Sequence, residues 1–171
     1  MKYLFISLLL FGGISTYNMP LRLSTRGKVD YAKFIFLTKN LESYRTLRLI
    51  GIDKFNHYVK DENTIILDTR SRDAYEDVHL KGAVNLPFSD FTAKKLAALI
   101  PSKSSRILIY CNNNFESNFE ALANKDGGLA LNIPTFINLN GYGYLNVYEL
   151  DGYFKDYDDR LDLVISDDLD F

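Results

Sequence analysis

The sequence predicts an α/β fold in which a mostly parallel sheet is covered by helices on both faces. Three observations predict this class. Short apolar runs alternate along the chain with stretches of helical spacing. The short runs are apolar throughout, as in strands buried on both sides. The composition, with 47% hydrophobic and 25% charged residues among 171, is that of one domain with a substantial core.

The first sixteen residues are expected to be a signal peptide. Lys2 provides a positive start, residues 4–11 are apolar apart from Ser7, and small residues follow. The run is shorter than the roughly 20 apolar residues that cross a membrane. We therefore expect cleavage near Ser15 or Thr16, export to the periplasm or the extracellular space, and no membrane association of the mature protein.

Three further segments follow the leader. Residues 17–50 form a basic N-terminal extension, with a helix expected around residues 41–49. Residues 51–160 form the main domain, and residues 161–171 form an acidic tail. With 20 basic and 22 acidic residues, the net charge of −2 argues against a nucleic-acid partner.

The first half of the main domain contains two expected strands and three helices. Asp53 is placed to cap a helix over residues 54–60, and the β-branched run at residues 64–67 predicts a buried strand. Ser71 is placed to cap a helix over residues 72–77. A second short strand is expected at residues 83–87, where Pro87 stops it, and Ser89 is expected to open a helix over residues 90–100.

The second half is expected to alternate in the same way. The apolar run at residues 106–110 predicts a strand, and residues 118–124 predict a helix broken by two glycines. Residues 134–139 are expected to form an extra helix near the strand ends, and residues 146–150 the last strand. Ligands of such sheets bind at the carboxyl ends of the strands.

Cys111, the only cysteine, directly follows one of these strands. One cysteine cannot form an intrachain disulfide, so it is a free thiol. At a strand end that turns into a helix, backbone N–H groups and the helix dipole favour the thiolate. Such a thiolate can attack a sulfane sulfur without a metal or an organic cofactor. A small buried hydrophobic residue is the alternative role of a free cysteine.

Five short motifs then resemble the rhodanese-like domain family in their order and spacing. They are Asp68-Thr69-Arg70, Ala74-Tyr75, HLKGAVNLP at residues 79–87, ILIYC at residues 107–111 and GYLNVYELDG at residues 143–152. The resemblance implies a five-stranded sheet, with Cys111 as the nucleophile that carries a persulfide. It implies an anion-binding loop made of Asn112, Asn113, Asn114, Phe115, Glu116 and Ser117. It assigns architectural roles near the site to Asp68, Arg70, His79 and Gly82.

The expected partners follow from the same resemblance. They are a small sulfur-containing anion or a low-molecular-weight thiol, with a protein as a possible sulfur acceptor. Neither a cofactor nor a metal is expected.

The loop departs from the family pattern at two positions. Active relatives usually have a glycine where Asn114 stands and a cation where Glu116 stands. A carboxylate about 6 Å from the thiolate opposes it by roughly 3 kcal/mol at an effective dielectric of 20. A helix terminus offers only about 0.3–1 kcal/mol in return. An inward-facing Glu116 would therefore suppress the thiolate, and an outward-facing one would not. We expect poor thiosulfate turnover in either case.

The segment from Lys125 to Gly143 is longer than in the family pattern. The aromatic side chains in and next to this segment, Phe136, Tyr142 and Tyr144, are expected either in a rim around the site or in the core.

Three functions remain open on these grounds. The first is sulfur transfer through Cys111. The second is a rhodanese-fold module that binds a partner or senses oxidants through the thiol. The third is phosphatase-like or arsenate-reductase-like thiolate chemistry, which would need an arginine that residues 112–118 do not contain.

Overall fold

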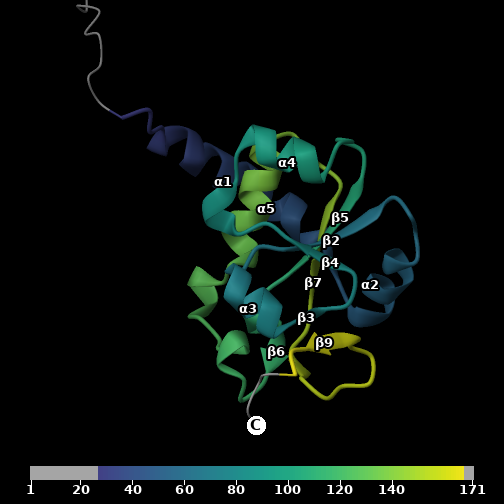
Figure 1. Cartoon of the computed structure of the whole chain (residues 1–171). Coiled ribbons are helices and arrows are strands. Elements are labelled where there is room, and N and C mark those ends of the chain that lie inside the picture. Colours follow the sequence, from purple (N-terminus) through teal and green to yellow (C-terminus); the bar gives the residue numbers. More distant parts are fainter. Residues whose placement is uncertain (1–26, 168–171) are drawn as a thin grey trace, which may run out of the picture. The chain divides into compact units, whose positions relative to one another are not determined.

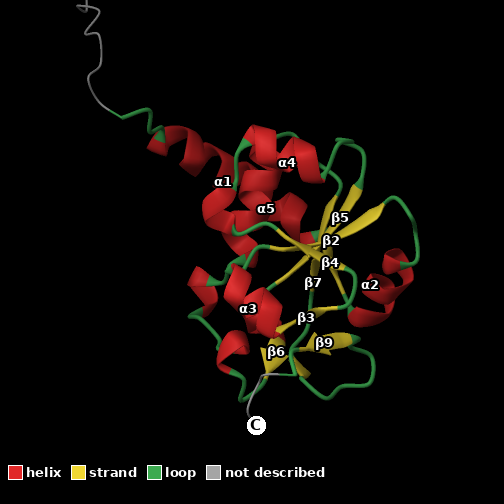
Figure 2. Ribbon diagram, viewed as in Figure 1, coloured by secondary structure: helices red, strands yellow, loops and turns green. Residues whose placement is uncertain are grey.

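The computed structural model describes residues 27–167. The expected signal peptide and the last four residues of the acidic tail lie outside the described residues. The chain divides into two units, residues 1–30 and residues 31–171. Every helix and strand described below belongs to the second unit (Figures 1 and 2).

The second unit begins with helix α1 (Tyr31–Thr46) and alternates strands with helices thereafter. The remaining elements of its first half are β1 (Leu49–Ile50), α2 (Ile52–Val59), β2 (Thr64–Asp68), α3 (Arg72–Asp77), β3 (Val78–Leu80), β4 (Ala83–Asn85), the 3₁₀ helix η1 (Phe88–Asp90) and α4 (Ala93–Leu99). Those of its second half are β5 (Arg106–Tyr110), η2 (Asn112–Asn114), β6 (Phe115–Glu116), η3 (Glu120–Leu122), η4 (Gly127–Leu129), α5 (Asn132–Gly141), β7 (Val147–Leu150), β8 (Phe154–Lys155) and β9 (Leu163–Ile165).

The central sheet has five strands in the order β1-β7-β5-β2-β4, and every neighbouring pair is parallel. The predicted five-stranded α/β fold is therefore confirmed. Strand β5 lies in the middle, because its apolar run is buried on both faces. Its side chains alternate between two cores. Ile107 and Ile109 contribute to one, and Leu108 and Tyr110 contribute to the other.

Helices cover both faces of this sheet (Figure 1). On one face, α4 and α5 bury Leu96, Phe136 and Leu139, and α1 adds the partly buried Leu41 and Tyr44. On the other face, α2 buries Ile52 and Phe55, and the side chains of α3 pack beside them. The two layers leave the carboxyl ends of β2 and β5 side by side, since Asp68 and Tyr110 are in register.

Several expected helices differ from the observed ones. Asp53 lies inside α2, whose N-cap is Gly51, so it does not cap that helix. The helix expected around residues 41–49 begins at Tyr31 and ends at Thr46.

Ser89 lies inside η1, and α4 begins after Thr92, whose hydroxyl accepts a hydrogen bond from the Lys95 N–H at 3.2 Å. The helix expected at residues 118–124 is only the short 3₁₀ turn η3. The next α-helix is α5, so the helix expected as an extra element is the crossover between β5 and β7.

Both flanking segments contribute to the fold. Strand β1 precedes the expected domain boundary at residue 51 and forms one edge of the sheet. Strand β9 lies in the expected tail and pairs antiparallel with β3. Within residues 27–167, no helix is both long enough and apolar enough to cross a membrane.

Candidate active site

Cys111 follows the last residue of β5 and lines a cavity of about 320 Å³. The cavity opens at the carboxyl ends of the strands, as the fold class predicts. Its other lining residues are Thr69, Arg70, Ser71, Ala74, Pro87, Phe88, Ser89, Asn112, Asn113, Lys125 and Leu131. The thiol borders this cavity but is deeply set, since the residue is only 2% exposed.

Three backbone N–H groups form hydrogen bonds to the Cys111 sulfur. One belongs to Asn113 in the turn after the cysteine, and two belong to Leu131 and Asn132 at the start of α5. N–H groups in the first turn of a helix have no partner within the helix, so they are available to an anion. The predicted cradle of amides is therefore present, but most of it comes from α5 rather than from the loop after Cys111.

Burial nevertheless raises the pKa of the Cys111 thiol above its ordinary value of 9.0. The N–H groups of Asn132, Asn113 and Leu131 lower the pKa, and the negative charge of Glu149 raises it further. The prediction that the site favours the thiolate was wrong. The loss of hydration outweighs the amides.

The carboxylate near the sulfur is Glu149 on β7, and Glu116 lies elsewhere. Glu116 is exposed, belongs to β6, and pairs in register with Lys155 of β8. It is outward-facing and does not line the cavity. Glu149 is 5% exposed, and burial raises its pKa while Arg45 lowers it.

The expected anion-binding loop is divided in the structure. Asn112 and Asn113 line the cavity, whereas Phe115, Glu116 and Ser117 do not. Phe115 is fully buried against Tyr110, with ring centroids 5.9 Å apart. Ser117 donates a hydrogen bond to the Asp156 carboxylate at 2.5 Å.

Asn114 lies beneath the site and joins it to the end of β7. Its Oδ1 accepts a hydrogen bond from the Cys111 N–H at 3.0 Å. Its Nδ2 donates to the carbonyl oxygens of Leu150 at 2.9 Å and Gly152 at 3.1 Å. Gly152 has φ +144°, and a Cβ there would lie 2.3 Å from the Phe154 ring. The asparagine at a position where relatives have glycine thus has a structural use.

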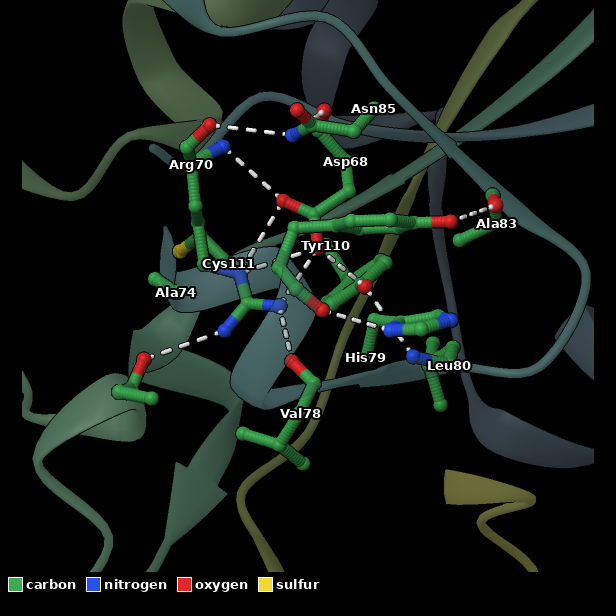
Figure 3. Close-up of polar contacts among 12 residues, drawn as sticks. Asp68, Arg70, Ala74, Val78, His79, Leu80, Ala83, Asn85, Tyr110 and Cys111 are labelled. Atoms are coloured by element: carbon green, nitrogen blue, oxygen red, sulfur yellow. Dashed lines mark hydrogen bonds and ion pairs between the residues drawn. The ribbon is translucent and has the colours of Figure 1, made fainter. Parts of the chain in front are cut away.

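A buried ionic cluster lies next to the cavity (Figure 3). Arg70 donates to both carboxylate oxygens of Asp68, with its shortest contact at 2.6 Å, and to the carbonyl oxygens of Val78 and Ala121. Tyr110 donates to Asp68 Oδ2 at 2.5 Å, and burial raises the Tyr110 pKa well above its usual value. These contacts join the ends of β2 and β5 to the start of β3.

His79 and Gly82 lie in the β3–β4 segment beyond this cluster. The His79 ring stacks on Tyr75 with centroids 4.0 Å apart, and its Nδ1 lies 2.6 Å from the Tyr75 carbonyl oxygen. Tyr75 in turn donates to the Ala83 carbonyl at 2.8 Å. Gly82 has φ +80°, a conformation that glycine adopts at low cost in a tight turn. Neither His79 nor Gly82 lines the cavity.

Lys125 is the exposed cation of the cavity lining, and sequence reasoning did not assign it to the site. The Asn113 side chain forms hydrogen bonds with both the carbonyl oxygen and the N–H of Lys125. Asn113 Nδ2 donates to the Lys125 carbonyl at 2.6 Å, and Asn113 Oδ1 accepts from the Lys125 N–H at 3.2 Å. The segment from Lys125 to Gly143 is longer than in the family pattern. In the sequence, this extra length was the only sign that Lys125 could belong to the site.

The aromatic side chains considered for a rim divide between core and surface. Phe136 and Tyr144 are fully buried, so they belong to the core. Tyr142 is 37% exposed but does not line the Cys111 cavity. Among residues 27–167, no three His, Cys, Asp or Glu side chains are grouped so that they could hold a metal ion.

Comparison with known proteins gives one curated relative. The sequence is 29% identical over 51 residues to the thiosulfate sulfurtransferase PspE of Escherichia coli strain K12. The match covers 30% of this chain and 48% of PspE, so the chain matches about half the length of this relative.

Solved structures with a similar fold include protein hp1203 of Helicobacter pylori, with 22% identity, a TM-score of 0.48, and coverage of 74% of this chain and 96% of that one. The rhodanese-like domain of Alr3790 from Anabaena sp. has 22% identity, a TM-score of 0.45, and coverage of 62% of this chain and 69% of that one.

A family model described as the rhodanese-like domain matches residues 52–160, which include Cys111 and the Asp68–Arg70 pair. Because this match covers more than half of the sequence, the chain belongs to the rhodanese-like domain family.

Proposed function

We propose that the protein is a sulfurtransferase that carries sulfane sulfur as a persulfide on Cys111. One observation carries the proposal. The chain's only thiol stands at the end of the central strand, borders a cavity, and receives hydrogen bonds from three backbone N–H groups. The distant relationship to a thiosulfate sulfurtransferase supports the same reaction class.

The reaction needs two displacements at sulfur and no cofactor. The Cys111 thiolate attacks the outer sulfur of a donor, and the donor's sulfur–sulfur bond breaks. The leaving group departs with that electron pair, as sulfite in the case of thiosulfate. The Cys111 persulfide then transfers its outer sulfur to an acceptor thiolate or to cyanide, and the Cys111 thiolate is restored. The three N–H groups stabilise the negative charge on both sulfur species.

The cavity favours a small anionic donor. Its volume lies at the low end of the roughly 300–1,000 Å³ that is usual for small-molecule sites. Arg70 is engaged with Asp68, so the exposed Lys125 is the lining cation that is available to a charged donor. A single available lining cation supports weak use of thiosulfate, a dianion. A persulfide of a low-molecular-weight thiol carries less charge and fits one cation better.

Intact mass measurement tests the proposal. The full chain is incubated with thiosulfate, with polysulfide or with a low-molecular-weight persulfide, and its mass is read under non-reducing conditions. We expect the mass of added sulfur from at least one donor, and none with Cys111→Ser. No uptake by the wild-type chain from any of the three donors would refute the proposal.

A second function is favoured by the raised pKa and the burial of the thiol. A poorly ionised, buried thiol is a weak nucleophile, so it suits a rhodanese-fold module that binds a partner better than fast turnover. Oxidant sensing would need an ionised and accessible thiol. No uptake of sulfur from any donor would favour the binding module, and uptake of oxygen from dilute peroxide would add a sensing role. Phosphatase-like or arsenate-reductase-like chemistry has less support, because Arg70 is committed to Asp68. Hydrolysis of an aryl phosphate, or reduction of arsenate with a thiol reductant, would revive it.

A further inference from the structure

Glu149 is a buried carboxylate beside the candidate nucleophile, and the two displacements described above do not use it. It lies on β7, is 5% exposed, and its negative charge acts on Cys111. A buried carboxylate needs a partner. Its partner is Arg45 near the end of helix α1, which donates from Nε at 2.8 Å and from a terminal nitrogen at 2.5 Å. Arg45 precedes residues 52–160, which match the family model.

Asn132 connects this ion pair to the sulfur. Its side-chain amide hydrogen-bonds the Glu149 carboxylate and also donates to Asn114 Oδ1 at 3.3 Å. The same Asn114 oxygen accepts the Cys111 N–H. The backbone N–H of Asn132 forms one of the three hydrogen bonds to the sulfur. A continuous path of hydrogen bonds therefore runs from α1, through β7 and the first residue of α5, to Cys111.

We infer that Arg45 and Glu149 are positioning residues, which hold the start of α5 against the Cys111 sulfur and make the thiol's reactivity depend on helix α1. Arg45 also offsets the charge of Glu149, which otherwise opposes a thiolate. The importance of this arrangement for turnover rests on the proposed sulfur transfer. The ionisation of the Cys111 thiol can be measured whether or not the protein transfers sulfur.

Other charged groups around the pair are few. Arg70 and Lys125 line the cavity, Asp68 is paired with Arg70, and Asp151 acts on Glu149. A substitution at position 45 leaves these interactions in place, and Glu149→Gln removes only the one with Asp151.

Two substitutions should move the thiol pKa in opposite directions. Arg45→Met keeps an unbranched stem but leaves Glu149 uncompensated, so the Cys111 pKa should rise. The Arg45 side chain is 31% exposed, so water can take its place beside Glu149. Glu149→Gln keeps an acceptor for Asn132 and removes the charge, so the Cys111 pKa should fall. A merely structural pair would destabilise the fold in both variants without these opposite shifts.

The test is the rate of iodoacetamide alkylation between pH 7.5 and 10.5, which reports Cys111 alone because it is the only cysteine. We expect alkylation at pH 8 to slow about tenfold in Arg45→Met and to accelerate about tenfold in Glu149→Gln, the effect of one pKa unit in each direction. The double variant removes both charges, so its two opposite shifts should add to return the rate to within about threefold of the wild type.

Lys39→Met is the matched control, since Lys39 is an exposed cation on the same helix. It should leave the alkylation profile unchanged, and Arg45→Lys should restore part of the wild-type rate. If Arg45→Met does not fold, the alkylation profiles of Glu149→Gln and Arg45→Lys still test the inference. Profiles of Glu149→Gln and Arg45→Met that match the wild type would overturn the inference. The expected shifts without sulfur uptake in any variant would uphold the inference and refute the proposed function.

Discussion

Two polar regions meet at the carboxyl ends of β2 and β5, and they are built in opposite ways. In the ionic cluster of Asp68, Arg70 and Tyr110, no buried side-chain nitrogen or oxygen lacks a hydrogen-bond partner. In the Cys111 cavity, Asn112 Oδ1 is buried without a partner, and the thiol has a raised pKa. A satisfied network fixes the strand ends, whereas an unsatisfied site leaves groups for a ligand to bind. The first region should therefore control stability and the second reactivity.

The largest expected effect is in the ionic cluster. Arg70→Leu leaves the Asp68 carboxylate buried without its cation, which should lower the free energy of unfolding by about 3–5 kcal/mol. Urea denaturation followed by circular dichroism measures this change. Exposed Arg72, two residues away, is the matched control, and Arg72→Leu should cost under about 0.5 kcal/mol. A loss below about 1 kcal/mol in Arg70→Leu would show that the cluster does not govern stability.

The second effect is the pH dependence of Cys111. Because its pKa in the folded chain is raised above 9.0, the alkylation rate should increase nearly tenfold per pH unit from pH 7 to pH 9. The same shift favours the protonated thiol in the fold. Its stabilising contribution is therefore present below pH 9 and is lost as the pH rises through the folded pKa. A rate that reaches its plateau below pH 8 would contradict this assignment.

A smaller effect is expected at the cavity mouth. Lys125→Glu replaces the exposed cation with an anion, which should raise KM for thiosulfate about tenfold while kcat changes little. Steady-state kinetics with cyanide as the acceptor measure both constants. Lys94→Glu, at an exposed position on α4, makes the same charge change away from the cavity. An equal rise in KM in both variants would mean that Lys125 acts only through the net charge of the molecule.

The smallest effect is expected at Glu116. Because this side chain is exposed and does not line the cavity, Glu116→Arg should change the thiosulfate KM by less than about twofold. Active relatives usually have a cation at this position, so a small effect would show that position 116 has no contact with the donor in this chain. A fall of tenfold or more would place Glu116 close to the bound donor after all.

Local patterns in the sequence predicted much of the fold and part of the site. The apolar runs before Asp68 and Cys111 predicted β2 and β5 correctly, since strands buried on both faces are uniformly apolar. Ser71 was correctly predicted as a helix cap, and its hydroxyl accepts a hydrogen bond from the Ala74 N–H at 3.2 Å. These features depend on residues that are close together in the chain.

The missed features depend on contacts between distant residues. Arg45 and Glu149 are separated by 104 positions, and nothing in either segment indicates that they pair. Residues 118–124 have the composition of a helix but form only η3, so the role of α5 as the source of the amides was not predicted. Burial of the sulfur also follows from packing, and local sequence gave no sign that it would outweigh these amides.

Gly152 links the evolution of the site to a residue outside it. Its carbonyl holds Asn114, and its backbone leaves no space for a side chain beside Phe154. In a saturation library selected for sulfur transfer, alanine at this position should be rejected as firmly as many changes in the cavity itself. Smaller residues in place of Phe154 should make it tolerated, so the two positions are expected to vary together.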